Sequence, residues 1–338
     1  RQKLDQYTQA ALDRLDLVIS CDTNQSTAIQ RTLLPYQHEL LAITCRSEKH
    51  IPMLGRIIPN APYVNSPTTE SLKWSSDKIE MRKRIATYNK KISPAFSLVT
   101  DTSNASIKNI EETIGYPLIV KPSGLASSVL VTICYHREEL IENLEKVFRK
   151  INSIYKKHHF QNEPQVLVEE FMEGEMYSVD AYVSPHGKVF FCPMVYIRTG
   201  KHIGFDDFFG YFQVTPTLLN KENIEAAQRA ATEAILALGM RSTTAHIEMM
   251  KTEQGWKIIE AGARVGGFRH MLYEYAYGFN HTANDLAIHL PEKPVVLKTV
   301  KGYTAAMKFY AQKEGKLAKL TGTKKAQDLK SFKKMYIN

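Results

Sequence analysis

Residues 243–267 read TTAHIEMMKTEQGWKIIEAGARVGG, and this stretch decides the fold. Two largely apolar segments, 244–250 and 256–261, flank a short polar turn, which predicts a pair of antiparallel strands. Glu248 lies on the first strand and Glu260 lies near the end of the second. The pairing can therefore bring both carboxylates to one face of the sheet, where two like charges are costly unless a divalent cation neutralises them.

The loop after the second strand adds a guanidinium to these carboxylates. Arg264 follows Glu260 by four residues, and Gly266 and Gly267 come directly after it. Carboxylate oxygens that converge on a ligand phosphate are the usual way in which Mg²⁺ is held, and glycines let the backbone approach a substrate closely. The pattern favours a metal site at Glu248 and Glu260 beside Arg264, and two solvated acids at a strand edge are the structural alternative.

A second motif surrounds Lys121. The strand-like segment 117–121 (PLIVK) ends in this lysine and is followed by PSGLASS, a loop of small residues that contains Ser123, Ser127 and Ser128. The backbone N–H groups and hydroxyls of such a loop can wrap phosphate oxygens, with the lysine as a point charge. A Gly/Ser hairpin without a ligand explains the same residues.

The third motif is the segment 166–175 (VLVEEFMEGE). An apolar strand ends in the paired acids Glu169 and Glu170, then Phe171 and Met172. Acidic side chains and strand-edge backbone groups can hydrogen-bond the edge of an adenine, and the two apolar side chains can cover its faces. A strand that runs into a charged turn is the alternative.

Taken in order, these motifs resemble the ATP-grasp superfamily, and within it the carboxylate–amine ligases, most closely the L-amino-acid (dipeptide-forming) ligases. The matching pieces are Ser76-Asp77-Lys78, YPLIVKPSGLASSV, VLVEEFMEGEMYSVD, and TTAHIEMM with IIEAGARVGG. The resemblance implies an α+β ATP-grasp fold in residues 71–295, with two α+β subdomains that clamp ATP. A partial Rossmann-like α/β domain in residues 1–70 would precede it, and a Lys-rich segment, 296–338, would follow.

The resemblance also implies roles for individual residues. The implied ATP-binding residues are Lys78, Lys121, Ser123, Ser127, Ser128, Glu169, Glu170, Phe171, Met172 and Glu175. The implied ligands of Mg²⁺ (or Mn²⁺) are Glu248 and Glu260, and the implied catalytic residues are Arg264 and Lys121. The implied substrate-binding residues are His246, Arg264, Gly266, Gly267, Lys201 and His202, the last two from a loop at 199–213.

Two positions depart from the family pattern. Where the family usually has Glu-x-Asn at the metal, this chain has Gly262, so one coordinating amide is lost and water or another oxygen must substitute. Met176 stands where a ribose-binding Glu is common, which leaves Glu175 or another residue to hold the sugar. Both metal carboxylates remain, which favours an active enzyme.

The predicted reaction is ATP-dependent ligation with small-molecule substrates. A carboxylate, amino-acid-like by the resemblance, is activated as an acyl phosphate and captured by an amine, giving an amide or peptide bond, ADP and phosphate. One alternative is an ATP-grasp enzyme that activates bicarbonate or a cofactor precursor. Another is a non-catalytic ATP-binding scaffold. Members of the family often form dimers, which leaves a homodimer open.

Composition and charge limit the classes of partner and of cellular location that remain. The 338 residues carry a net charge of +9, and the segment 297–338, with eleven Lys and two acids, accounts for all of it. A neutral body with a basic end predicts neither a nucleic-acid nor a membrane partner, and the apolar run 189–197 is far shorter than the roughly 20 residues of a membrane span. Four cysteines without metal-ligand spacing predict a reducing, cytoplasmic location.

The N-terminal residues 1–66 have an α/β pattern. Apolar runs at 15–20 (LDLVIS) and 39–44 (ELLAIT) predict strands, with a helix at 25–34 between them, and no GxGxxG follows either run. The chain opens at Arg1 without an initiator Met, so we expect the true N-terminus to lie upstream. Further helices are predicted at 68–89, 138–150, 220–239 and 270–277. Short turns between neighbouring strands favour α+β over a doubly wound sheet.

Overall fold

The computed structural model describes residues 9–10, 12–122, 131–157, 165–205, 207–310 and 315–337. The chain forms two compact units, Arg1–Met307 and Lys308–Asn338. The larger unit holds both β-sheets, and the described part of the smaller one contains the short helix α11 (Thr323–Gln327). Within these described ranges, no helix is long and apolar enough to cross a membrane.

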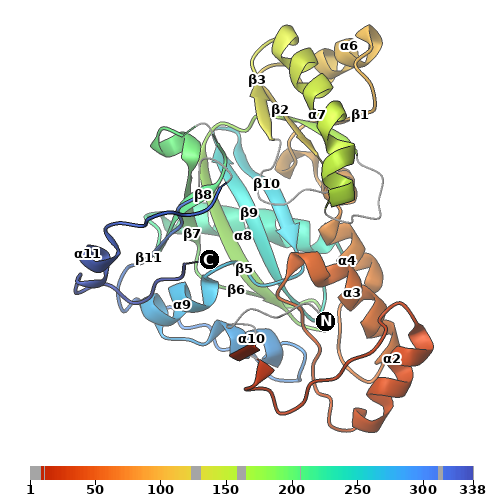
Figure 1. The fold of residues 1–338 in the computed structure, drawn as a ribbon, viewed down its shortest axis with the longest axis vertical. Helices are drawn as coiled ribbons and strands as arrows, with labels where there is room; N and C mark the ends of the chain where they lie inside the picture. The colour runs from red at the N-terminus through yellow and green to blue at the C-terminus, as the bar shows by residue number, and fades with distance from the viewer. Residues whose placement is uncertain are drawn as a thin grey trace. The chain divides into compact units, whose positions relative to one another are not determined.

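The smaller sheet is entirely antiparallel. Its strands, in spatial order, are β1 (Phe96–Val99), β4 (Val166–Glu170), β2 (Leu118–Pro122) and β3 (Thr132–Cys134). The helices α6 (Asn104–Thr113) and α7 (Arg137–Lys157) pack on it through a shared apolar core (Figure 1). In α7 the buried Leu140, Leu144 and Val147 recur at helical spacing, which is why the predicted helix at 138–150 forms here.

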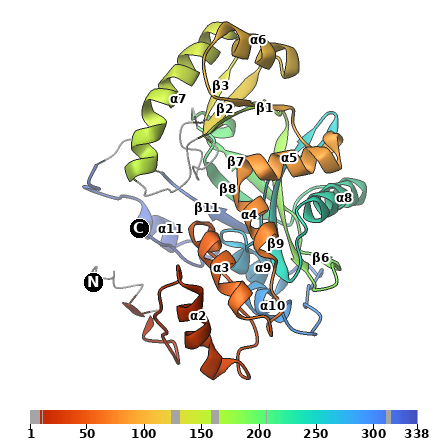
Figure 2. The same cartoon turned by 90° about the vertical axis from the view of Figure 1, so that its right-hand side faces the viewer.

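The larger sheet carries the fold-deciding strand pair at one edge. Its spatial order is β10 (Gly255–Gly262), β9 (Thr243–Thr252), β5 (Glu175–Val183), β7 (Val195–Thr199), β8 (Gly210–Thr215) and β11 (Thr304–Met307), and β6 (Val189–Phe191) pairs with β5. The helix α8 (Lys221–Ala237), capped by Asn220, packs on one face with an apolar core. The helix α9 (Arg269–Tyr277) packs with β5 and β7 in a separate core, followed by α10 (His281–Ala287) (Figure 2).

Alternation along β5 and β9 separates apolar from polar chemistry. Val179 and Ala181 of β5, like Ala245 and Ile247 of β9, belong to the core beneath α8. Side chains between them point to the opposite face, as successive residues of a strand must. That second face receives the polar residues of the candidate site.

The N-terminal segment differs from the prediction. Its described elements are η1 (Leu34–Tyr36), η2 (Glu48–His50), η3 (Ile58–Asn60), α2 (Ser26–Leu33) and α3 (Ile51–Ile57). The helix at 25–34 is confirmed, but the strands expected at 15–20 and 39–44 are wrong. Apolar runs form strands only where neighbours complete the hydrogen-bond ladder and cover the side chains, whereas Val18 and Leu41 are more than half exposed. The described residues therefore contain no Rossmann-like sheet here.

The other predicted elements fall close to their expected places. The helical region 68–89 is α4 (Thr69–Ser76) and α5 (Lys78–Tyr88), followed by η4 (Lys90–Ile92). The run 189–197, expected as one strand, is divided into β6 and β7 around Pro193, which has no N–H for a ladder. The domain boundaries at 70/71 and 295/296 stay predictions.

The side chain of Arg82 on α5 forms hydrogen bonds with both sheets. Its side chain is fully buried, and Nε donates to Oε1 of Glu169 on β4 at 2.8 Å. Its other two nitrogens donate to backbone carbonyls of β10, Nη1 to Ile258 at 2.6 Å and Nη2 to Ile259 at 2.9 Å. One guanidinium thus satisfies acceptors from both sheets.

Replacing Arg82 should destabilise the protein strongly. Arg82→Met leaves the buried carboxylate of Glu169 with one cation fewer, and breaking a buried pair in this way costs about 3–5 kcal/mol. We expect that loss in the free energy of unfolding measured by urea denaturation. Lys83→Met, an exposed change on the same helix, should stay within about 0.5 kcal/mol. Equal losses in the two variants would contradict the bridge.

Candidate active site

Glu248 and Glu260 are direct register partners across β9 and β10. A β-bulge between Ile258 and Glu260 makes this possible, because Ile258 and Ala261 both face the core beneath α8. Strict alternation would have sent Glu260 to the same face as Ile258. The bulge shifts the alternation by one residue and turns Glu260 toward Glu248, in the way that bulges re-aim side chains beside active sites.

The pKa values of the two carboxylates are shifted in opposite directions. Burial raises the pKa of Glu260 above its ordinary range, and the negative charges of Glu48 and Glu248 add to this, while Lys78, whose Nζ lies 3.9 Å away, opposes it. Burial would also raise the pKa of Glu248, but its hydrogen bond with His246 and nearby positive charges outweigh burial and lower that pKa to about 2. Positive groups of the protein thus outweigh burial at Glu248, and at Glu260 they do not.

Arg264 lies beside this pair, in contact with a residue that sequence reasoning missed. Its Nη2 donates to Oε2 of Glu48 at 2.6 Å, and its Nη1 donates to the carbonyl of Val265 at 3.1 Å. The buried Nε has no hydrogen-bond partner among the described residues. Glu48 comes from η2, 216 residues away, and lies in no motif, so no local signal marks it.

Lys121 and Glu169 form the second part of the site. Lys121 Nζ lies 2.6 Å from Oε2 of Glu169, whose other oxygen accepts from Arg82. Burial opposes ionisation of Glu169, but the charges of Arg82 and Lys121 keep its pKa below the ordinary range. Both oxygens of this carboxylate are therefore bonded to protein cations.

The residues after Glu169 are also held by the protein. The Glu170 carboxylate contacts Nζ of Lys257 at 2.8 Å, and its backbone N–H donates to the carbonyl of Ala95 at 2.9 Å. The Phe171 N–H donates to the carbonyl of Pro117 at 3.2 Å, and Met172 is buried. The remaining predicted ATP-binding residue of this region, Glu175, accepts from the hydroxyl of Tyr177 at 3.0 Å.

The predicted loop residues divide into two groups. Ser123, Ser127 and Ser128 lie outside the described residues. Lys201 and His202 lie on η5 (Gly200–Ile203), where Nδ1 of His202 accepts from the Thr199 N–H at 3.3 Å and closes the turn. The structure thus gathers Lys78, Glu248, Glu260 and Arg264, and it holds His202 in a separate turn.

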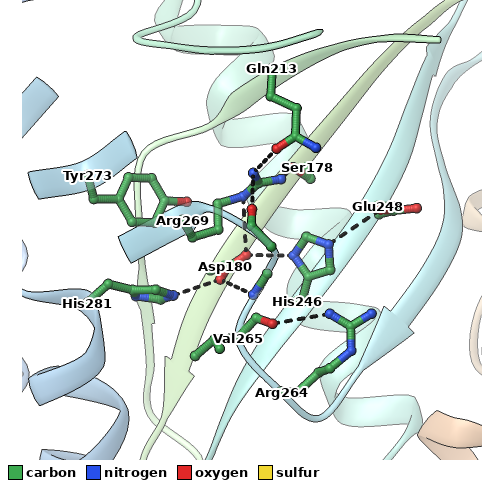
Figure 3. A network of polar contacts seen from close by, with 12 residues as sticks. Ser178, Asp180, Gln213, His246, Glu248, Arg264, Val265, Arg269, Tyr273 and His281 are labelled. Atoms are coloured by element: carbon green, nitrogen blue, oxygen red, sulfur yellow. Dashed lines mark hydrogen bonds and ion pairs between the residues drawn. The ribbon is translucent and has the colours of Figure 1, made fainter. Parts of the chain in front are cut away.

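A buried network behind the carboxylates was not predicted (Figure 3). Asp180 of β5, fully buried, accepts from Nδ1 of His246 at 2.7 Å, from Nε2 of His281 at 2.9 Å and from the Gly266 N–H at 2.8 Å. Arg269 donates to Oε1 of Gln213 at 2.6 Å. An acid in the middle of an apolar strand, MYSVDAYV, is the signal that could have found it, since such a group must be paired.

The two loop glycines have different surroundings. A Cβ on Gly266 would lie 2.5 Å from Nδ1 of His246 and 2.8 Å from Cγ of Arg269, whereas a Cβ on Gly267 would meet nothing within 4 Å. At Gly262 an added Cβ would make only ordinary contact with Arg264. The sequence therefore requires glycine at 266 because of close packing, while position 262 has room for a side chain.

The donor set fits a divalent cation that is shared with a phosphate ligand. Among the described residues no three His, Cys, Asp or Glu side chains converge as a complete metal cage. Mg²⁺ is commonly held by one or two carboxylates together with substrate phosphates and water, and a pair of carboxylates is what Glu248 and Glu260 provide.

Comparison with known proteins identifies the domain. The profile of the ATP-grasp domain matches residues 114–271. Over 323 residues, 95% of this chain, the sequence is 23% identical to the uncharacterised protein y4rH of Sinorhizobium fredii, of which 64% is covered. Over 170 residues, 46% of this chain, it is 29% identical to the alanine–anticapsin ligase of Bacillus subtilis, of which 35% is covered. The L-amino acid ligase structure from Bacillus licheniformis aligns with a TM-score of 0.62 and 21% identity, over 81% of this chain and 61% of that one.

These similarities confirm the predicted ATP-grasp resemblance, for residues 114–271, and the predicted α+β ATP-grasp fold. At 21% identity, the structural similarity concerns the fold alone. The chain spans less than two thirds of the length of the two curated relatives, 64% of one and 35% of the other. The roles of the individual site residues stay predictions.

The two carboxylates should respond oppositely to neutralisation in the absence of metal. The ionised form of Glu248, whose pKa of about 2 lies below the ordinary 4.5, stabilises the fold above pH 4.5, and this contribution is lost as the pH falls toward 2. The raised pKa of Glu260 means that its ionised form opposes folding at neutral pH. At pH 7 we expect Glu248→Gln to lower, and Glu260→Gln to raise, the free energy of unfolding by about 1 kcal/mol, after allowance for solvent screening.

Chemical denaturation in EDTA measures both changes. Excess Mg²⁺ with ATP should remove the advantage of Glu260→Gln, because only the wild-type protein gains stability from the bound cation. A loss of stability of similar size in both variants would contradict the opposite pKa shifts of the two carboxylates.

Proposed function

We propose that this protein, which carries an ATP-grasp domain in residues 114–271, is an ATP- and Mg²⁺-dependent ligase that joins a carboxylate to an amine. The observation that carries the proposal is the cross-strand pair of Glu248 and Glu260, with Lys78 and Arg264 beside it. Two adjacent carboxylates suit a cation, and two cations of the protein suit the phosphates of a nucleotide.

Glu248 and Glu260 would hold Mg²⁺ or Mn²⁺. The bound cation would neutralise charge on the β- and γ-phosphates, as divalent ions do in phosphoryl transfer. Lys78 and Lys121 would contact the same phosphates, and the loop with Ser123, Ser127 and Ser128 would cover them. The ion pair that holds the Lys121 ammonium group against Glu169 at the end of β2 supports this role.

The strand end at 169–172 would receive the adenine. Since the carboxylate oxygens of Glu169 and the N–H groups of Glu170 and Phe171 already have protein partners, recognition would fall to backbone carbonyls and to the Met172 N–H. Phe171 and Met172 would cover the faces of the base. Glu175 would hold the ribose in place of the acid that Met176 replaces.

Arg264 would stabilise the acyl phosphate that forms when the substrate carboxylate attacks the γ-phosphate. The phosphoryl group moves from ATP to the carboxylate, ADP leaves, and the amine then displaces phosphate from the acyl carbon. An incoming anion would share the Arg264 guanidinium with Glu48, which accepts from Nη2 at 2.6 Å. The guanidinium, always charged and bidentate, suits this role.

Substrate recognition is proposed for the residues around the loop at 263–267. His246, Gly266 and Gly267 would line the acceptor side, and Lys201 and His202 would approach it from the 199–213 loop. Closure of that loop would exclude water, which hydrolyses acyl phosphates. Amino-acid-like substrates are the first class to test, as the name of the L-amino acid ligase suggests. We also propose that the protein is cytoplasmic and that its domains are residues 1–70, 71–295 and 296–338.

A second candidate function is a scaffold that binds ATP without turnover. Gly262, which supplies no side-chain ligand to the cation, favours it. It predicts ATP binding with no ADP formed for any acceptor, whereas a ligase forms ADP only when its carboxylate is present.

ADP release, measured against amino acids singly and in pairs, tests the ligase. We expect release that depends on a carboxylate substrate, and Glu260→Gln should reduce it by at least about 100-fold, because a catalytic metal contributes several kcal/mol to the barrier. Glu253→Gln, an exposed change in the turn of the same hairpin, is the matched control and should keep full activity. Undiminished turnover by Glu260→Gln would exclude the metal assignment.

A further inference from the structure

A line of polar contacts leads from Glu248 into the interior of the larger sheet (Figure 3). Glu248 Oε1 lies 3.4 Å from Nε2 of His246, and Nδ1 of the same ring lies 2.7 Å from Oδ1 of Asp180. The other oxygen of Asp180 accepts from Nε2 of His281 and from the backbone N–H of Gly266. Asp180 is thus joined to Glu248 through a single imidazole ring.

The position of Asp180 is costly unless every contact is made. Its side chain has no exposed surface, and an ionised carboxylate in such a place is tolerated only when it is paired and hydrogen-bonded. It accepts three hydrogen bonds from three parts of the chain: His246 on β9, the loop at 263–267 and His281 on α10. A carboxylate is the only side chain of this size that offers acceptors alone.

The contact with His246 orients Glu248. With Nδ1 held by Asp180, the imidazole plane is set and Nε2 is directed at the Glu248 carboxylate. The Gly266 backbone packs closely against the same edge of the ring, because a Cβ added to Gly266 would lie 2.5 Å from Nδ1 and 2.7 Å from Cε1 of His246. Asp180 and Gly266 together restrict the orientation of His246.

The contact with Gly266 orients the Arg264 loop. The Gly266 N–H donates to Asp180 at 2.8 Å, two residues after Arg264. Arg269 holds the next residue, since its Nη1 donates to the carbonyl of Gly267 at 3.1 Å. The backbone that carries the guanidinium is therefore bonded to the same buried acid as His246.

We infer that Asp180 is a positioning residue for the metal site: from beneath, it holds His246 and Gly266, and through them the Glu248 carboxylate and the Arg264 loop. The inference rests on the proposed function. Partners that orient metal ligands from behind typically contribute about 10–100-fold to metal affinity. Asp180 does not touch substrate or metal, so its effect should appear as lost metal affinity in a protein that remains folded.

Mn²⁺ binding provides a readout that does not depend on turnover. The free ion is titrated by electron paramagnetic resonance in the presence of a non-hydrolysable ATP analogue, with the full chain. Asp180→Asn keeps the shape but turns an NH₂ group toward one of three donors. We expect the Mn²⁺ dissociation constant to rise about 10–100-fold, with a cooperative thermal transition retained.

Thr244→Val is the matched control. Thr244 lies two residues before His246 on β9, is fully buried, and donates its hydroxyl to Asp285, away from the carboxylate pair. Its loss removes a buried hydrogen bond from the same strand, and Mn²⁺ affinity should stay within about twofold. If Asp180→Asn does not fold, His246→Gln interrupts the same connection at its middle and should weaken Mn²⁺ by a similar factor.

The outcomes separate this inference from the function it rests on. Wild-type affinity for Mn²⁺ in Asp180→Asn, or in His246→Gln where that variant is used, would overturn the positioning role and leave the ligase proposal intact. Equal weakening by Thr244→Val would assign the effect to general loosening of the sheet and also overturn it. A wild-type protein that binds no Mn²⁺ with the nucleotide would overturn the proposed function and this inference together.

Discussion

The buried guanidinium of Arg82 is the interaction on which the arrangement of the site depends. It bonds Glu169 on the smaller sheet and two carbonyls on β10 of the larger one. The Lys121–Glu169 pair lies on the first sheet and the Glu248–Glu260 pair on the second, so this single side chain connects the two halves of the candidate site. Well-packed apolar groups often replace buried ion pairs without loss of stability. What Arg82 contributes here is therefore relative placement, since no apolar side chain can satisfy acceptors from both sheets.

Within the site, the negative charge of one carboxylate, Glu260, is compensated less fully than that of the others. Glu169 and Glu48 each contact a cation of the protein, and the network behind Glu248 holds its pKa low. Glu260 differs, because burial and neighbouring carboxylates keep its pKa high even with Lys78 nearby. A divalent cation bound as proposed would relieve this remaining cost, and metal affinity would then be linked to the stability of the folded chain. The free energy of binding the cation and the free energy of folding would thus both depend on Glu260.

Sequence reasoning succeeded where the information is local and failed where it is not. Two apolar segments joined by a polar turn predict β9 and β10, and helical spacing predicts α7. The bulge before Glu260 cannot be seen in that pattern, although it decides which face the carboxylate joins. Glu48 and Asp180 meet their partners across 216 and 66 residues, so the sequence alone does not show which residues they contact. The run at 15–20 has the composition of a buried strand, but a strand also requires neighbours, which composition does not record.

Position 262 relates the carboxylate pair to the network around Asp180. Gly262 is the register partner of His246, just as Glu260 is the partner of Glu248. A side-chain amide at position 262, beside the two carboxylates proposed to hold the metal, would therefore lie opposite the imidazole that Asp180 holds. Among the described residues no third His, Cys, Asp or Glu side chain joins the two carboxylates in place of that amide. Two oriented carboxylates alone leave most of the coordination sphere of Mg²⁺ to phosphate and water. The cation should therefore bind together with the nucleotide, because only then are enough oxygen ligands present to complete its coordination sphere. The rigidity that Asp180 gives to Glu248 then compensates for the missing ligand, because less side-chain entropy is lost on binding.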